Sequence, residues 1–226
     1  MNFVHRFSFI FFFFLFANVN SAVYGQQGDT KEKQKDLLSS LNWKKWSPDP
    51  VPLFTPQESL SQFKLAPGFR IELVAHEPMV KDPVFMDWDD KGRMWVGELR
   101  TYMMDLDGTG EDRRMSRVMV LEDTDQDGVM DKATPFLEDM LNVRSLAFVS
   151  GGVLVVETGG LWFCRDKDGD LRCDERKKLF DFATSAKDNI EHAENALHYA
   201  LDNWMYNSKS SRKLAWRKGK LIEMPA

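Results

Sequence analysis

An acidic loop occurs twice in this 226-residue sequence and carries most of its potential metal ligands. The first copy reads DTDQDGVMD over 123–131, and the second reads DKDGDLRCD over 166–174. A shift of 43 residues, from position 123 to position 166, places four aspartates of one copy on four of the other. They are Asp123, Asp125, Asp127 and Asp131 in the first loop, and Asp166, Asp168, Asp170 and Asp174 in the second. Such a period indicates a supersecondary unit that is used more than once.

The spacing of these aspartates fits two interpretations. Carboxylates at relative positions 1, 3, 5 and 9 resemble the first three quarters of a calcium loop, and Gly128 at position 6 allows the sharp turn. The glutamate expected at position 12 is missing, because Thr134 and Lys177 stand there, and Leu171 replaces the glycine in the second copy. The alternative is a turn whose side chains accept hydrogen bonds from their own backbone amides. A Ca²⁺ ion bound here would be structural rather than catalytic.

Few other residues could carry chemistry. His192 and His198 lie in IEHAENALHYALDNWMY, and a neutral imidazole near a carboxylate can act as a general base. Cys164 and Cys173 bracket the second acidic loop. In an oxidising compartment they could form a disulfide, and the alternative is two free thiols. The sequence has no CxxCH motif, so we expect no haem site in this chain.

The first 25 residues predict export. His5 and Arg6 precede an apolar run over 7–16 that is about half the ~20 residues a membrane span needs. We therefore expect a signal peptide over 1–25 and a periplasmic or extracellular protein, with an uncut anchor as the alternative. Residues 26–54 are polar and predict a flexible leader. The net charge of -5, without a concentrated basic patch, argues against nucleic acid as a partner.

The remainder, 55–226, predicts short strands after one short helix. Thr55, Pro56 and Glu58 form a helix-start signature, and the alternation over 69–75 predicts a strand. Three later segments, 86–99, 146–157 and 197–208, each predict a hairpin. The expected turn residues are Gly92, Gly152 and Asn203. Residues 186–201 also have helical spacing, but the repeat favours a strand at their end.

Together these hairpins predict an all-β fold. Each unit contains about four short strands over roughly 45 to 60 residues, which is the blade size of a β-propeller. Residues 55–226 hold about three such units, whereas propellers close with four or more blades. An open array leaves strand edges and apolar faces uncovered. We therefore expect a partial propeller, either truncated or completed by a partner.

Several separate blocks of the sequence resemble one family. They are FKLAPGFRIELVAHEPMVKDPVFMDWDDKGRMWVGELRTYMMDLDGTGED, RVMVLEDTDQDGVMDKATPFL, GGVLVVETGGLWFCRDKDGD and HAENALHYALDNWMY. In this order they look like the N-terminal part of PVC-type haem-binding proteins, also called membrane-bound dehydrogenase-domain proteins. The resemblance implies a six-bladed propeller similar to soluble quinoprotein glucose/sorbosone dehydrogenases, followed by helical repeats and a c-type cytochrome.

The same resemblance implies oxidation of a sugar or polyol by pyrroloquinoline quinone (PQQ). His192 has the spacing of the family's catalytic base from Leu197, Asp202 and Tyr206. The residues that hold PQQ and its Ca²⁺ come from later blades, so we expect this chain to be inactive alone. Its partner would be a downstream polypeptide with the remaining propeller and the haem domain. The alternatives are a non-enzymatic propeller that binds carbohydrate or protein and is stiffened by Ca²⁺ at its hairpin tips, and a non-functional remnant.

Overall fold

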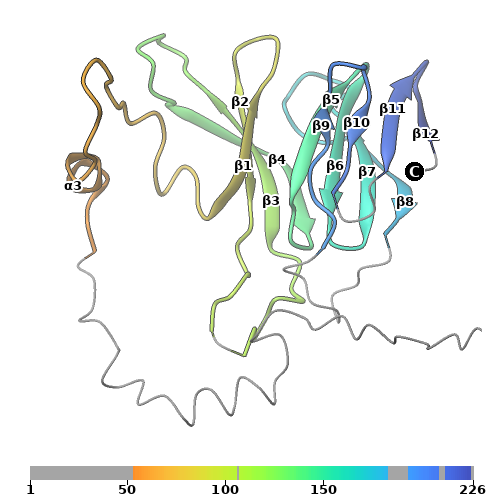
Figure 1. Cartoon of the computed structure of the whole chain (residues 1–226), viewed down its shortest axis with the longest axis horizontal. Coiled ribbons are helices and arrows are strands. Elements are labelled where there is room, and N and C mark those ends of the chain that lie inside the picture. The colour runs from red at the N-terminus through yellow and green to blue at the C-terminus, as the bar shows by residue number, and fades with distance from the viewer. Residues whose placement is uncertain (1–52, 106, 183–192, 209–211, 225–226) are drawn as a thin grey trace, which may run out of the picture. The chain divides into compact units, whose positions relative to one another are not determined.

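The computed structural model describes residues 53–105, 107–182, 193–208 and 212–224 (Figure 1). The expected signal peptide over 1–25, nearly all of the expected leader over 26–54, and His192 lie outside these described residues.

No helix among the described residues is long and apolar enough to cross a membrane.

Twelve strands in the described residues form three four-stranded antiparallel sheets. Sheet 1 contains β1 (Pro83–Trp88), β2 (Met94–Glu98), β3 (Ser116–Glu122) and β4 (Lys132–Met140). Sheet 2 contains β5 (Ser145–Val149), β6 (Gly152–Glu157), β7 (Gly160–Arg165) and β8 (Glu175–Asp181). Sheet 3 contains β9 (His198–Tyr199), β10 (Met205–Tyr206), β11 (Lys213–Arg217) and β12 (Lys220–Met224). Strands adjacent in sequence are adjacent in each sheet, so the predicted all-β fold of four-stranded units is confirmed.

The N-terminal part confirms one expected element and contradicts another. Helix α3 (Pro56–Ser61) begins with a capping box in which Thr55 Oγ1 accepts the Glu58 N–H and Glu58 Oε2 accepts the Thr55 N–H, at 3.2 and 2.7 Å. Residues 69–75, expected to be a strand, have no strand assignment. Alternation gives the chain a polar and an apolar side, but a strand also needs a neighbour for its backbone ladder. No strand pairs with this segment among the described residues.

The first hairpins of the three sheets use left-handed turn residues. Gly92 (φ 76°) and Asn203 (φ 62°) each donate an N–H to the carbonyl three residues earlier, at 3.1 and 3.0 Å. Glycine and asparagine tolerate this conformation best. In sheet 2 the left-handed residue is Gly151 (φ 87°), not Gly152 as the repeat predicted, because Gly152 already begins β6. The β5–β6 turn is shorter than the other two turns, so its left-handed residue lies one position earlier than the sequence alignment of the repeats predicted.

The segment before β9 resolves one ambiguity in favour of the repeat. The end of 186–201 forms β9, as the repeat predicted, and residues 193–197 are not helical. The other residues of the predicted helix, up to His192, lie outside the description. The strand forms in place of the helix because β9 pairs with β10, so its backbone groups are hydrogen-bonded across the sheet instead of within a helix.

The three sheets pack in sequence order through two apolar clusters. Between sheets 1 and 2, Trp95 makes edge contacts with Phe136 and Phe148, with ring centroids 4.6 and 5.4 Å apart. Between sheets 2 and 3, Phe163 stacks on Trp216 with ring centroids 4.8 Å apart. Burial of apolar surface is the dominant favourable contribution to folding, so these two clusters fix how successive sheets meet.

A buried carboxylate ties sheet 2 to the end of sheet 1. The Glu157 side chain is 4% exposed, and its Oε2 accepts hydrogen bonds from the Leu141 N–H and Arg114 Nη2, at 2.7 and 2.9 Å. Its Oε1 accepts from Trp162 Nε1 (2.8 Å) and lies 3.5 Å from Arg176 Nη2. A buried charge is tolerated only when it is paired and hydrogen-bonded, and Glu157 meets both conditions.

The change Glu157→Gln should lower the free energy of unfolding by about 2–4 kcal/mol, because it removes the charge that two guanidinium groups share in a buried setting. Urea denaturation followed by tryptophan fluorescence measures this. The control is Glu122→Gln, which breaks an exposed pair with Lys132 (2.6 Å) and should cost less than about 1 kcal/mol. Equal costs for the two variants would contradict the role of Glu157.

Candidate functional site

Both acidic loops connect the third strand of a sheet to the fourth. The first, 123–131, joins β3 to β4, and the second, 166–174, joins β7 to β8. The sequence repeat is therefore also a structural repeat, with each loop at the same place in its own sheet.

The first aspartate of each loop organises the turn. Asp123 Oδ2 accepts the Gly128 N–H, and Asp166 Oδ2 accepts the Leu171 N–H, both at 2.9 Å. The Oδ1 atom of Asp166 also accepts the Gly169 N–H at 2.7 Å. Burial acts to raise the pKa of Asp166, but these amide donors outweigh it and hold the pKa below the usual value. The carboxylate is thus kept ionised.

The last aspartate of each loop closes its neck. Asp131 Oδ2 accepts the Thr124 N–H at 3.2 Å, and Asp174 Oδ2 accepts the Lys167 N–H at 2.6 Å. These matching bonds are the self-bonded turn that the sequence offered as the alternative to a calcium loop. Two lone pairs per carboxylate oxygen leave room for an ion beside these bonds, so the turn does not exclude a metal.

Three of the four aspartates in each loop converge. Ligand oxygens of Asp123, Asp125 and Asp131 lie within 4.8 Å of one another, and those of Asp166, Asp168 and Asp174 do the same. Calcium takes oxygen ligands at 2.3–2.6 Å, so this separation fits two ligands on opposite sides of one ion. The remaining predicted ligands, Asp127 and Asp170, do not belong to these groups; each instead accepts a backbone N–H two residues on, at 2.8 Å.

Position 12 cannot complete either loop. Thr134 lies in β4 opposite Val120, and Lys177 lies in β8 opposite Phe163. Both are strand residues with side chains that lack a carboxylate. A Ca²⁺ ion at either loop would need backbone carbonyls or water for the rest of its six to eight ligands.

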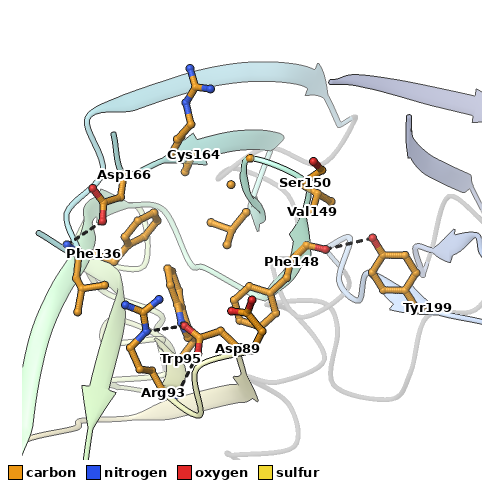
Figure 2. A pocket seen from close by; sticks show the side chains of 16 residues that line it. Asp89, Arg93, Trp95, Phe136, Phe148, Val149, Ser150, Cys164, Asp166 and Tyr199 are labelled. Carbon is orange, nitrogen blue, oxygen red and sulfur yellow. Dashed lines mark hydrogen bonds and ion pairs between the residues drawn. The ribbon is translucent and has the colours of Figure 1, made fainter. Parts of the chain in front are cut away.

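A pocket of about 690 Å³ lies at the hairpin turns of sheets 1 and 2, next to the second acidic loop (Figure 2). Its aromatic lining residues are Trp95, Phe136, Phe148 and Tyr199. Tyr199 comes from sheet 3, and its hydroxyl donates to the Phe148 carbonyl at 3.2 Å. Among the described lining residues, the charged side chains are Asp89, Asp90, Arg93, Arg165 and Asp166.

The Asp89 carboxylate in this pocket is structural. Its Oδ2 accepts hydrogen bonds from Arg93 Nε and Trp95 Nε1, at 2.7 and 3.0 Å, and these bonds are drawn in Figure 2. Burial opposes ionisation, but the bonds from Trp95 and Arg93 hold the pKa of Asp89 below its usual value. It is therefore a poor proton acceptor. Sequence reasoning found the turn at Gly92 but missed this residue, whose only signal was an aspartate at the start of a turn.

The expected catalytic base, His192, lies outside the described residues, but its spacing partners are described. Tyr206 Oη donates to Asp202 Oδ2 at 2.7 Å, and Lys213 Nζ lies 3.3 Å from the same oxygen. The Tyr206 hydrogen bond lowers the pKa of Asp202. The third partner, Leu197, is buried in the core between sheets 2 and 3. The structure thus brings Asp202 and Tyr206 together and adds Lys213, which the spacing did not reveal.

The arginines that pair with buried carboxylates in the described sheets are not free to hold PQQ, which carries three carboxylates. Arg117 is committed to buried Glu98, with Nε 2.5 Å from Oε2. Arg114 and Arg176 are committed to Glu157. In the part of the chain that the structure describes, these arginines therefore do not fit as a quinone-binding cradle.

One comparison identifies the family. Residues 55–223 match the family described as a domain of unknown function, DUF7133. The chain belongs to this family. The match runs from the capping residue of α3 into β12, so the DUF7133 domain includes both acidic loops and both inter-sheet cores. None of the curated proteins matches the chain.

The two acidic loops have different residues at one left-handed backbone position, and this difference tests whether the loops share the same backbone conformation. Position 4 is left-handed in both, as Gln126 (φ 64°) and as Gly169 (φ 86°). Gln126→Gly should raise the free energy of unfolding by up to about 1 kcal/mol, and Gly169→Ala should lower it by about 1 kcal/mol, because only glycine adopts this conformation without cost. Thermal melts of both variants measure the difference. The same sign for the two variants would contradict the equivalence.

Proposed function

We propose that the DUF7133 chain forms three consecutive blades of a β-propeller. Each sheet is a four-stranded antiparallel meander, and successive sheets pack face to face in chain order. Both properties are typical of propeller blades. The proposed array is incomplete, and its closure depends on further sheets.

The exposure of equivalent side chains carries this proposal. Met86, Leu146 and Leu197 occupy the same position in the first hairpin of each sheet, and their exposed fractions are 62%, 6% and 5%. Leu146 is buried against sheet 1 and Leu197 against sheet 2. The position two residues on does not separate the sheets in this way, because Trp88 is 46% exposed and its equivalent Tyr199 in sheet 3 is 50% exposed. A further sheet on this face of sheet 1 would cover Met86.

Residues 72–76 support the same conclusion. Val74 O accepts the Met130 N–H at 2.8 Å, and Phe136 O accepts the N–H of the equivalent residue, Cys173, at 2.9 Å. Phe136 lies in β4, the fourth strand of the sheet that precedes sheet 2. The segment around Val74 thus stands in the place of a fourth strand from a sheet preceding sheet 1. We infer that the first three strands of that sheet come from another part of the complete protein.

By resemblance, the completed ring would be a six-bladed, quinoprotein-like sugar or polyol dehydrogenase in the periplasm or outside the cell. His192 would be the general base toward the substrate hydroxyl. The paired arginines of the described sheets do not suit PQQ, so the groups that hold PQQ would come from the remaining blades. A downstream polypeptide would supply these blades and the haem domain that receives electrons. The cofactor would supply the oxidation chemistry.

We expect no dye reduction by this chain alone with PQQ, Ca²⁺ and a panel of aldoses and polyols, because the quinone has no cradle in it. A ring-complete DUF7133 protein should reduce the dye, and changing its counterpart of His192 to alanine should lower kcat at least about 100-fold, the contribution typical of a general base. The counterpart of exposed His198 provides the matched control. Activity unaffected by the His192 change, or absent with every substrate, would reject the dehydrogenase.

A second candidate function is a non-enzymatic module that binds carbohydrate or protein and is stabilised by Ca²⁺. The two convergent aspartate groups favour it, because both copies keep the same three carboxylates together. The pocket of Figure 2, with Tyr199 on its wall and polar groups around it, would offer a site for a small polyhydroxy ligand. In this case Ca²⁺ would hold the hairpin tips and take no part in a reaction.

If the first loop binds Ca²⁺, two of its aspartates should differ in their effect on the affinity. Asp125→Asn should weaken Ca²⁺ binding at the first loop at least about tenfold, because Asp125 belongs to the convergent group. Asp127→Asn removes the same charge outside that group and should change the affinity less than about threefold. Calorimetric titration and the rise in melting temperature with Ca²⁺ measure both variants. No heat and no melting shift with the unchanged protein would leave the loops as turns only.

A further inference from the structure

The two cysteines occupy positions whose side chains meet across the neck of an acidic loop. Under the 43-residue shift, Cys164 and Cys173 correspond to Leu121 and Met130 of the first loop. Leu121 and Met130 are buried in one apolar cluster. Cys164 is buried in the equivalent cluster of sheet 2, and Cys173 packs against that cluster. The fold thus places both residues of each pair on the same side of the loop neck.

The two thiols contact each other but differ in exposure. A hydrogen bond joins the Cys173 and Cys164 side chains. The Cys173 thiol is partly exposed and donates to the Glu175 carbonyl at 3.2 Å, whereas the Cys164 thiol is buried. Cys173 is therefore the thiol that an external disulfide can reach first.

We propose that Cys173 and Cys164 form a dithiol–disulfide pair that locks the second acidic loop. The Cys173 thiolate attacks one sulfur of an external disulfide, which releases one thiolate and leaves a mixed disulfide on Cys173. Cys164 then loses its proton to solvent and attacks the Cys173 sulfur, which releases the second thiolate and closes the intrachain bond. Two protein thiols are oxidised and one external disulfide is reduced, so the exchange balances.

The bond would act on the hydrogen-bonded turn between the cysteines. Asp166 holds that turn through the amides of Gly169 and Leu171. A covalent link across the neck restricts opening of this segment, because it removes conformations in which the two strand ends separate. The first loop has no cysteine and cannot be locked in this way. This inference depends on neither PQQ nor Ca²⁺, and so stands apart from the proposed function.

Oxidised glutathione is the probe for the exchange, with the reduced full-length chain as the substrate. Intact mass under non-reducing conditions should show loss of two hydrogens and no lasting glutathione adduct. Cys164→Ser should accumulate the adduct on Cys173, and Cys173→Ser should react at least about tenfold more slowly, because only the buried thiol remains. A lasting adduct on the unchanged chain, or equal rates for the two variants, would overturn the proposal.

One further readout separates a functional pair from two thiols that merely touch. Amide hydrogen exchange at Gly169 and Leu171 should slow at least about tenfold on oxidation. The equivalent amides of the first loop, which has no cysteine, are the internal control. Unchanged exchange at Gly169 and Leu171, or equal slowing in both loops, would reject the lock.

Discussion

The need to cover both apolar faces of each four-stranded sheet governs the rest of this structure. Sheet 2 meets this need fully, because sheets 1 and 3 cover its two faces. Sheet 1 is covered on one face, whereas among the described residues its other face packs against the segment 72–80, which leaves Met86 and Trp88 exposed. A single sheet in such an array cannot satisfy this requirement alone. The chemistry at the loops therefore depends on packing that extends from one sheet to the next.

The polar groups also differ between the packed junctions of the sheets and the exposed loops. Buried Glu157 satisfies backbone, indole and guanidinium donors where sheet 1 meets sheet 2, so the charges there serve the junction. The acidic loops lie at the hairpins between third and fourth strands, where their carboxylates satisfy backbone amides and remain near solvent. Carboxylate ligands are thus available at the loops, whereas the arginines beside buried Glu157 and Glu98 are already paired.

Sequence repeats are informative here because each copy reports on the other. The Met130 N–H donates to the Val74 carbonyl, and the equivalent Cys173 N–H donates to the Phe136 carbonyl in β4. This match shows that the segment around Val74 occupies the position of a fourth strand, which the alternating sequence of that segment did not reveal. The expected strand over 69–75 does not form, because its neighbours on the other side are missing from the described chain. Leu121 and Met130 likewise show why two cysteines nine residues apart in sequence come together.

The sequence by itself determined the local elements. The cap at Thr55, the turns at Gly92 and Asn203 and the paired acidic loops follow from backbone preferences and side chains a few residues apart. It misplaced the turn glycine of sheet 2 by one residue, because loop length is set by how β5 pairs with β6. Only the tertiary structure decided which carboxylates are buried and paired, and which sheet face stays open. These properties depend on residues far apart in the chain, and their distances are fixed only when the sheets pack.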